Sequence, residues 1–261
     1  KVSLAVATGS PGYFSLRVDA LRQGKVIDSA RTSFAVLEDH DFSSAGNSPF
    51  GVCTHFGQWW KTEIIPLIKL AGIREIRDEQ YWGELEKEKG SFQFPEKYER
   101  YMKELAREKI AVHMGLTYGN KLYHEGRAPY DEEGYRAFER YSAELVKHFP
   151  GTISSVEVWN EWNSPPFSAG PAAAKPDIYM AMLGHTFRQM KKDHPGLTIA
   201  GCSTTGLWWG GYYWLERFFG LRGALDSMDV LSVHPYNCAL EPEYLEDSMA
   251  KLKAMMKKAG G

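Results

Sequence analysis

The sequence predicts an α/β protein: a (β/α)8 TIM barrel truncated after its sixth βα unit and preceded by a short antiparallel β segment. Three observations predict this fold. The first 37 residues alternate apolar and polar side chains in the manner of strands. From residue 50 onward, strand-like runs alternate with amphipathic, helix-like runs. Polar side chains follow each of these later strand-like runs, and barrels of this kind carry their sites at the carboxyl ends of their strands.

Residues 1–37 contain three strand-like runs, at 2–6, 13–18 and 32–37, with Gly-rich turn signals between them. Three strands make a poor independent domain. We therefore expect 1–37 to be the end of a β-sandwich module. Residues 38–49, which are rich in Asp and Ser, read as a linker.

The barrel domain is expected over residues 50–261, incomplete at its C-terminus. Strands are expected near 50–56, 73–77, 110–116, 154–160, 197–202 and 229–234, and helices near 61–71, 95–109, 132–148, 177–194, 212–222 and 241–259. Asp131 and Asp177 are suitable N-caps for two of the helices. Repeated strand–helix units imply parallel strands joined by right-handed crossovers. A full barrel takes roughly 250 residues, so six units in about 210 fit a barrel that lacks two.

A doubly wound open sheet is the competing architecture, and an α/β oxidoreductase is the function that would go with it. The first strand is not followed by the Gly-x-Gly-x-x-Gly turn that binds a dinucleotide, and the chain has no phosphate-binding loop. Both alternatives are therefore disfavoured.

Composition narrows the classes of partner. Lys and Arg number 31 against 33 Asp and Glu, for a net charge of -2, so neither nucleic acid nor an anionic membrane is an expected partner. No apolar run approaches the ~20 residues of a membrane helix. The chain opens at Lys1 without a signal peptide, which suggests part of a longer protein. The eight Trp and 14 Tyr include many in expected loops, where exposed aromatic side chains usually have a ligand.

The three cysteines are widely spaced, with no Cys-x-x-Cys pair, so we expect no structural zinc site and no disulfide framework. Cys53 and Cys202 are interpreted as buried thiols. No metal or other cofactor is expected.

The most informative stretch is Val-Glu-Val-Trp-Asn-Glu-Trp-Asn at 156–163. A short buried strand there would deliver Asn160 and Glu161 at its carboxyl end, and Pro165 and Pro166 would end the regular structure. A carboxylic acid can protonate a departing glycosidic oxygen, an amide can bind a sugar hydroxyl, and indoles such as Trp162 stack on pyranose rings. The alternative is an ordinary strand end with turn residues.

Several motifs, in this order and spacing, resemble those of clan A glycoside hydrolases, most closely the group around family thirty-nine. They are Phe-Gly-Val-Cys-Thr-His-Phe at 50–56, Ile-Arg-Asp-Glu-Gln-Tyr-Trp at 76–82, Gly-Ser-Phe-Gln-Phe at 90–94, Tyr-Gly-Asn at 118–120, Trp-Asn-Glu-Trp-Asn at 159–163 and Val-His-Pro-Tyr at 233–236. The resemblance spans residues 50 to about 240, and it is weak for the substrate.

The resemblance implies a role for each matching position. Glu161 would be the general acid/base, Asn160 would bind the sugar 2-hydroxyl, and Arg77 would orient the nucleophile. His234 and Tyr236 would contact sugar and nucleophile. Residues with less specific roles would line sugar subsites: His55, Tyr118, Asn120, Trp82, Trp162 and Trp208.

The clan's nucleophile is a second Glu at the end of strand seven, and no Glu of this chain matches it. Glu79 and Glu125 are neighbours of the site by loop position only. The resemblance thus implies a retaining hydrolase acting on O-glycosidic bonds of an oligo- or polysaccharide, with a second chain or segment supplying the last two strands. An extracellular or periplasmic location is favoured. The alternative is a non-catalytic carbohydrate-binding barrel or an inactive fragment.

Overall fold

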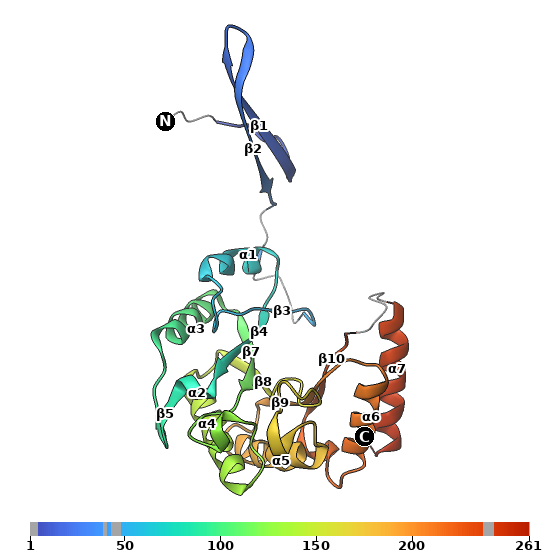
Figure 1. The fold of residues 1–261 in the computed structure, drawn as a ribbon. Helices are drawn as coiled ribbons and strands as arrows, with labels where there is room; N and C mark the ends of the chain where they lie inside the picture. Colours follow the sequence, from blue (N-terminus) through green and yellow to red (C-terminus); the bar gives the residue numbers. More distant parts are fainter. Residues whose placement is uncertain (1–4, 39–40, 43–47, 237–242, 261) are drawn as a thin grey trace.

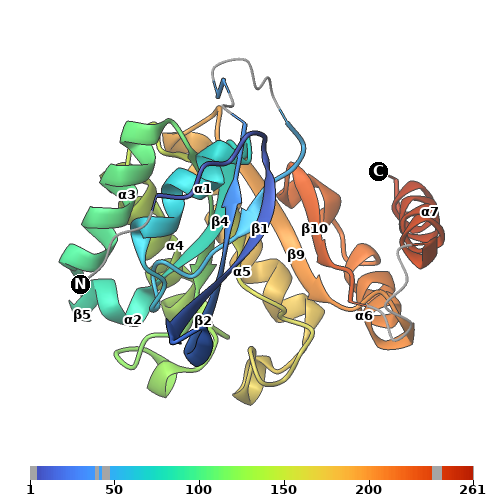
Figure 2. The same cartoon turned by 90° about the horizontal axis from the view of Figure 1, so that it is seen from above.

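The computed structural model describes residues 5–38, 41–42, 48–236 and 243–260. Its centre is a six-stranded sheet in the order β10–β9–β8–β7–β4–β3, with every neighbouring pair parallel. The strands are β3 (Val52–Cys53), β4 (Glu75–Tyr81), β7 (Ala111–Thr117), β8 (Ile153–Val158), β9 (Thr198–Thr205) and β10 (Val230–His234). The sheet curls into half of a barrel, with β3 and β10 as its outer strands (Figures 1 and 2).

Helices follow the strands in the predicted alternation. They are α1 (Ile65–Leu70), α3 (Glu96–Glu108), α4 (Glu132–His148), α5 (Pro176–Asp193), α6 (Trp209–Phe219) and α7 (Glu243–Lys258). The α/β class and a curled half-barrel of six parallel strands are therefore confirmed. The strand predicted at 50–56 is much shorter in the structure, because only Val52 and Cys53 pair with β4.

The two predicted N-caps have different outcomes. Asp131 caps α4 as predicted, and its Oδ1 accepts a hydrogen bond from the Gly134 backbone N–H at 3.0 Å. Asp177 is not a cap: α5 starts one residue earlier, at Pro176, because proline is well suited to the first helical position, where no N–H is needed. Asp177 instead lies in the first turn, where a carboxylate favours the helix dipole.

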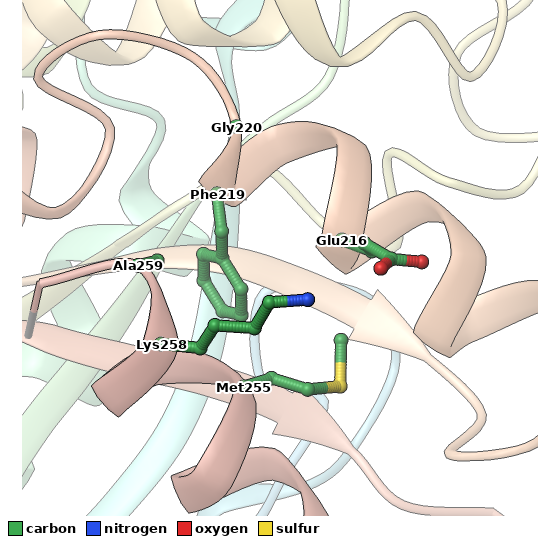
Figure 3. A pocket seen from close by; sticks show the side chains of 6 residues that line it. All are labelled: Glu216, Phe219, Gly220, Met255, Lys258 and Ala259. Atoms are coloured by element: carbon green, nitrogen blue, oxygen red, sulfur yellow. The ribbon is translucent and has the colours of Figure 1, made fainter.

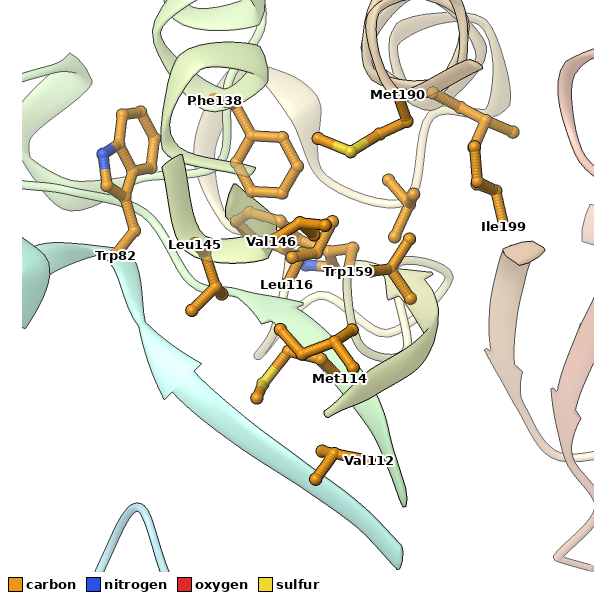
Figure 4. Close-up of a cluster of buried hydrophobic side chains, with 14 of the residues drawn as sticks. Trp82, Val112, Met114, Leu116, Phe138, Leu145, Val146, Trp159, Met190 and Ile199 are labelled. Carbon is orange, nitrogen blue, oxygen red and sulfur yellow. The ribbon is translucent and has the colours of Figure 1, made fainter. Parts of the chain in front are cut away.

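The core lies between the convex side of the sheet and the helices. Val112, Met114 and Leu116 alternate along β7 and belong to the same cluster as Phe138 of α4, and all four side chains are fully buried (Figure 4). The other members labelled there are Trp82, Leu145, Val146, Trp159, Met190 and Ile199. Successive side chains of a strand point to opposite faces, so this apolar face leaves the alternate positions to line the concave side. Arg77, His113 and Glu157 occupy such positions, and the concave side is therefore polar.

The N-terminal segment is a two-stranded antiparallel hairpin, β1 (Gly12–Arg22) and β2 (Lys25–Val36), which projects away from the half-barrel in Figure 1. Phe14 pairs with Phe34 across it, with ring centroids 5.4 Å apart. The predicted antiparallel segment is therefore present, but the third strand predicted at 2–6 is not seen where described: residues 1–4 lie outside the described part, and Ala5 and Val6 are not in a strand. The domain boundaries at 37 and 49 remain predictions.

Phe42 of the linker contacts the half-barrel. Phe42 is buried, its ring lies 4.5 Å from the Arg74 guanidinium carbon, and its carbonyl accepts a hydrogen bond from Arg74. Lys69 lies over the same ring at 5.6 Å. These cation–π contacts attach the linker to α1, through Lys69, and to the residue before β4, Arg74.

A small insertion was not predicted. Helix α2 (Trp82–Leu85) follows β4 directly, and β5 (Glu86–Glu88) and β6 (Ser91–Phe92) form a short hairpin before α3. Elements this short leave no periodic signal in the sequence.

The cysteine interpretation is half right. Cys202 is buried, as predicted, but Cys53 is exposed because β3 is an outer strand, and both are free thiols. Cys238 lies outside the described residues. None of the described helices is both long and apolar enough to cross a membrane.

Candidate active site

A polar hollow of about 500 Å³ lies at the carboxyl ends of the strands. Most of the predicted site residues meet there, from strands that are far apart in the sequence. Its lining comprises Cys53, His55, Gln58, Arg77, Glu79, Tyr118, Asn160, Glu161, Phe167, Val233, His234, Pro235 and Tyr236. Seven of the predicted site residues are among them: Glu161, Asn160, Arg77, His55, Tyr118, His234 and Tyr236.

Glu161 enters the hollow through an unusual stretch of backbone. Strand β8 ends at Val158, and Trp159 and Glu161 then take positive φ values of 71° and 49°. Side-chain-bearing residues rarely adopt this left-handed conformation, and such strain concentrates at functional sites. The Glu161 N–H donates to the Ser203 carbonyl at 2.7 Å, which fixes the turn against β9.

Arg77 lies at the centre of the polar network. Its Nε and Nη2 reach the same oxygen, Oε2 of Glu157, at 2.7 and 2.6 Å. Nη2 also donates to Asn160 Oδ1 at 3.0 Å, and Nη1 lies 3.2 Å from Glu79 Oε1. The guanidinium fork thereby links β4 to β8 across the strand between them.

Asn160 is held from both ends of its amide. Its Oδ1 accepts from Arg77, and its Nδ2 donates to the Tyr118 hydroxyl at 3.0 Å. The Tyr118 ring is stacked on Phe167, with centroids 5.9 Å apart. The amide is therefore oriented before any ligand arrives.

His234 joins the two glutamates of the β8 segment. Its Nδ1 lies 2.9 Å from Glu161 Oε1, and its Nε2 lies 3.3 Å from Glu157 Oε1. Only the imidazolium form can donate through both nitrogens, so the geometry favours the charged ring. Ser232 donates a further hydrogen bond to Glu157 Oε1.

The electrostatics follow from this network. Burial opposes ionisation of Glu157, which is 1% exposed, but the hydrogen bond from His234 and the charge of Arg77 hold its pKa well below the ordinary value. Burial likewise lowers the pKa of His234, yet the hydrogen bond and charge of Glu157 outweigh it and raise that pKa above 6.5. Burial raises the pKa of Glu79, and Arg77 only partly offsets the shift.

Two lining residues have weaker anchors. His55 Nδ1 lies 3.1 Å from Gln58 Nε2. Tyr236 is exposed at the rim.

Asp78, next to Arg77, points the other way. It accepts hydrogen bonds from Thr54 Oγ1 at 2.6 Å and Phe56 N at 2.8 Å, and these bonds hold the loop after β3 in place.

Four predicted site residues do not line the polar hollow. Trp82 and Trp162 are fully buried, and their indole N–H groups donate to Glu86 and to the Lys175 carbonyl. Asn120 is buried and donates to the Glu86 carbonyl at 2.8 Å. Trp208 is exposed, but its ring covers Gly206 rather than the hollow. The sequence could not separate a packed indole from a ligand-facing one, because both occur in loops after strands.

Glu157 and Glu79 were missed as members of the polar network. Glu157 was interpreted only as the polar position of an alternating strand. The residues around Glu157 in β8 are buried on both faces of the sheet. A buried Glu at such a position needs a charged or hydrogen-bonding partner. The need for such a partner was the only feature of the sequence that could have indicated the role of Glu157. Glu125, the other glutamate considered, lies on an exposed loop and pairs with Arg127.

Within the described ranges, no group of three or more His, Cys, Asp or Glu side chains is arranged to hold a metal ion.

A separate hollow of about 290 Å³ lies between α6 and α7 (Figure 3). Phe219 and Met255 form its apolar wall, and Glu216 and Lys258 stand at its rim. It belongs to the helical layer and contains none of the strand-end residues.

Known structures decide the fold. A family 39 glycoside hydrolase from the gut symbiont Bacteroides cellulosilyticus superposes with a TM-score of 0.72 at 24% identity, over 87% of this chain and 46% of that one. The half-barrel has a family 39-like glycoside hydrolase fold. A monomeric β-xylosidase from Caulobacter crescentus gives 0.58 at 14% identity, over 80% of this chain and 49% of that one.

A conserved exported protein from Bacteroides fragilis gives a TM-score of 0.60 at 12% identity, over 81% of this chain and 57% of that one. This chain thus spans about half the length of the family 39-like structures it matches. No protein-family model matches the sequence, and no curated protein matches it either.

Proposed function

We propose that this family 39-like chain is part of a retaining glycoside hydrolase that cleaves O-glycosidic bonds of an oligo- or polysaccharide. The observation that carries the proposal is the placement of Glu161. Its side chain is 13% exposed, lies just beyond the carboxyl end of β8, and shares the polar hollow with Asn160, Arg77 and His234. A carboxyl group that is nearly buried yet still opens on a hollow is suited to proton transfer.

The proposed reaction begins with proton transfer. Glu161 donates its proton to the glycosidic oxygen as the bond between that oxygen and the anomeric carbon breaks. A second carboxylate attacks the anomeric carbon and forms a covalent glycosyl–enzyme intermediate. Glu161, now ionised, takes a proton from the water that hydrolyses this intermediate, so the starting state is restored.

The second carboxylate is proposed to come from a further strand beside β10, supplied by another segment or another chain. Two observations support this assignment. β10 is an outer strand of the described sheet, and the family implied by the motifs has its nucleophile on the next strand. Glu79 also lines the hollow, but its side chain is nearly buried and its Oε1 is paired with Nη1 of Arg77.

Asn160 and His234 are proposed to bind the sugar that is cleaved. The Asn160 amide is preoriented, and a hydroxyl between it and Glu161 would meet both a donor and an acceptor. The similar exported protein from Bacteroides fragilis supports an extracellular or periplasmic location for this chain.

The second candidate is a carbohydrate-binding half-barrel without chemistry. The Glu161–His234 contact favours it in one respect, because Oε1 of Glu161 is already engaged by His234 Nδ1 at 2.9 Å.

A screen of sugar release separates the two candidates. The whole protein, which includes the proposed second carboxylate, and this chain alone are each incubated with β-1,4-linked xylo-, manno- and gluco-oligosaccharides. Products are counted by chromatography, while binding is measured in parallel by calorimetry. Release that is lost in Glu161→Gln supports the hydrolase. Binding without release, in the whole protein as well as in this chain, supports the binding module. Neither binding nor release would contradict both.

A further inference from the structure

A second hollow adjoins the polar one. Its volume is about 420 Å³, and Tyr118 lines both hollows. The remaining lining residues come from the segments that follow β4 and β7: Tyr81, Gly83, Glu84, Glu86, Lys87, Gly119, Asn120, Lys121 and Leu122. Both segments begin at the carboxyl ends of their strands, so the second hollow opens on the same side of the sheet as the first.

Aromatic rings form the boundary between the hollows. The Tyr81 and Tyr118 ring centroids lie 5.6 Å apart and the rings are inclined by 52°. The Tyr118 hydroxyl accepts from Asn160 in the polar hollow, while its residue also borders the second one. A chain-like molecule bound at Glu161 would therefore pass Tyr118 on its way into the second hollow.

The walls of the second hollow are fixed by buried hydrogen bonds. Asn120 Nδ2 donates to the Glu86 carbonyl at 2.8 Å, and Asn120 Oδ1 accepts from the Leu122 N–H at 2.9 Å. The Glu86 carboxylate is itself buried and receives the Tyr123 hydroxyl at 2.8 Å. Asn120 was predicted to contact a sugar. In the structure its side chain is buried and holds the Leu122 loop in place.

The lining of the second hollow combines charged side chains with the rings of Tyr81 and Tyr118 and the side chain of Leu122. Lys87 Nζ donates to the Gly83 carbonyl at 2.8 Å, and Glu84 is paired with Lys97 at 2.5 Å. Lys121 is exposed at the opposite segment. Aromatic and aliphatic walls with a few charged groups at the edge suit a pyranose ring, which presents apolar C–H faces and a belt of hydroxyls.

We propose that this second hollow binds a further pyranose unit of the same substrate, so that the site takes an oligosaccharide spanning Tyr118 rather than a single sugar. The proposal rests on the proposed function of the polar hollow. It replaces the buried tryptophans with Tyr81 and Tyr118 as the aromatic side chains that contact the extended substrate.

Gly83 offers a way to fill the second hollow without touching the first. A Cβ built on Gly83 meets no atom nearer than the Gly119 carbonyl oxygen at 3.7 Å, an ordinary contact, and the backbone is not in the left-handed region. Gly83→Tyr is therefore expected to fold with its ring in the hollow. Gly196→Tyr is the matched control, because a Cβ there meets nothing within 4 Å and the residue lies in the loop before β9, at the opposite end of the sheet.

The measurement is the gain in affinity with ligand length. Calorimetry on the Glu161→Gln chain uses β-1,4-linked xylo-, manno- and gluco-oligosaccharides of two, three and four units, for the best-binding series. We expect an affinity gain of about tenfold at the unit that reaches the second hollow. Gly83→Tyr should abolish this gain and leave the affinity for the shortest ligand unchanged, whereas Gly196→Tyr should retain it.

A second variant guards against misfolding. Tyr81→Ala removes the aromatic wall instead of filling the hollow, and should also abolish most of the gain. Affinity that does not grow with length, or a gain that survives in a folded Gly83→Tyr chain and in Tyr81→Ala, would overturn the second subsite alone. Failure of every oligosaccharide to bind would instead overturn the proposed function, and the subsite with it.

Discussion

Arg77 and Glu157 are joined across an intervening strand: two nitrogens of the Arg77 guanidinium reach Oε2 of Glu157 at 2.6 and 2.7 Å, over the top of β7. The pair is possible because the β7 residue between them is Gly115, which is in register with Glu157 on one side and with Glu79 on the other. A buried pair of this kind organises its neighbours, because Asn160 and His234 each bond to one of its members.

The guanidinium group of Arg77 should not be replaceable by the ammonium group of a lysine. Arg77→Lys keeps the positive charge but replaces three nitrogens with one, so it cannot hold Glu157 and Glu79 on separate nitrogens as the guanidinium does. Losing one charged hydrogen bond costs about 1.5–3 kcal/mol. We expect kcat/KM to fall by about ten- to a hundredfold on the substrate found by screening. Unchanged turnover in Arg77→Lys would show that the fork does not orient the site.

Gly115 should be required for the space it leaves. A Cβ there would lie 3.0 Å from Glu79 Cγ and 3.6 Å from Arg77 Nη2. Gly115→Val therefore displaces both side chains, and overpacking of this kind costs about 1–3 kcal/mol. We expect a lower unfolding midpoint in urea together with lost sugar binding. Gly196→Val, in open space, is the control; equal behaviour of the two variants would contradict the spacing argument.

The pH dependence of His234 tests the charge network. Its pKa is raised above 6.5 in the folded chain, so the stabilising contribution is complete below 6.5 and is lost as pH rises through the folded value. Glu157→Gln should lower the His234 pKa, measured from the imidazole proton shifts by NMR. Glu99→Gln, which removes the exposed partner of His148, should leave it unchanged. A His234 pKa that is insensitive to Glu157→Gln would mean that the two side chains do not interact in solution.

Trp162 should behave as a core residue. Its ring is fully buried against Trp159 and Tyr179, with centroids 5.2 and 5.3 Å away. Trp162→Ala should reduce the free energy of unfolding by about 3–5 kcal/mol. Trp59→Ala, at a side chain 85% exposed, should change it by less than about 0.5 kcal/mol. If Trp162→Ala instead weakened sugar binding with no loss of stability, the indole would belong to a subsite.

The fold was predictable because its signals repeat. Each βα unit carries its own periodic pattern, and strand ends such as Arg77 and His234 are placed together by parallel topology alone. The hairpin after α2 and the N-terminus of α5 were not predictable, because a two-residue strand and a proline-initiated turn leave little pattern.

The site was predictable only at its chemical groups. Glu161 and Asn160 follow from a motif, but the direction of a side chain depends on packing. Trp82 and Trp162 point into the core, where they pack against the helices. Trp82 contacts Phe138 of α4, and Trp162 contacts Tyr179 of α5. Glu157 was hidden because its partners, Arg77 and His234, lie about eighty residues away on either side in the chain.

The proton-donor role of Glu161 is tested most directly by two leaving groups, in a hydrolytically active preparation of the protein. A proton donor matters for an alkyl glycoside, whose leaving oxygen is basic, and hardly matters for a 2,4-dinitrophenyl glycoside. Glu161→Gln should therefore lower kcat/KM, which reports the first bond cleavage and not the later attack of water, by about 10²–10⁴-fold for the alkyl glycoside and by less than about tenfold for the dinitrophenyl glycoside. Glu125→Gln, on the exposed loop, should slow neither. Equal losses on both substrates, or no loss on the alkyl glycoside, would contradict the assignment of Glu161 as the acid.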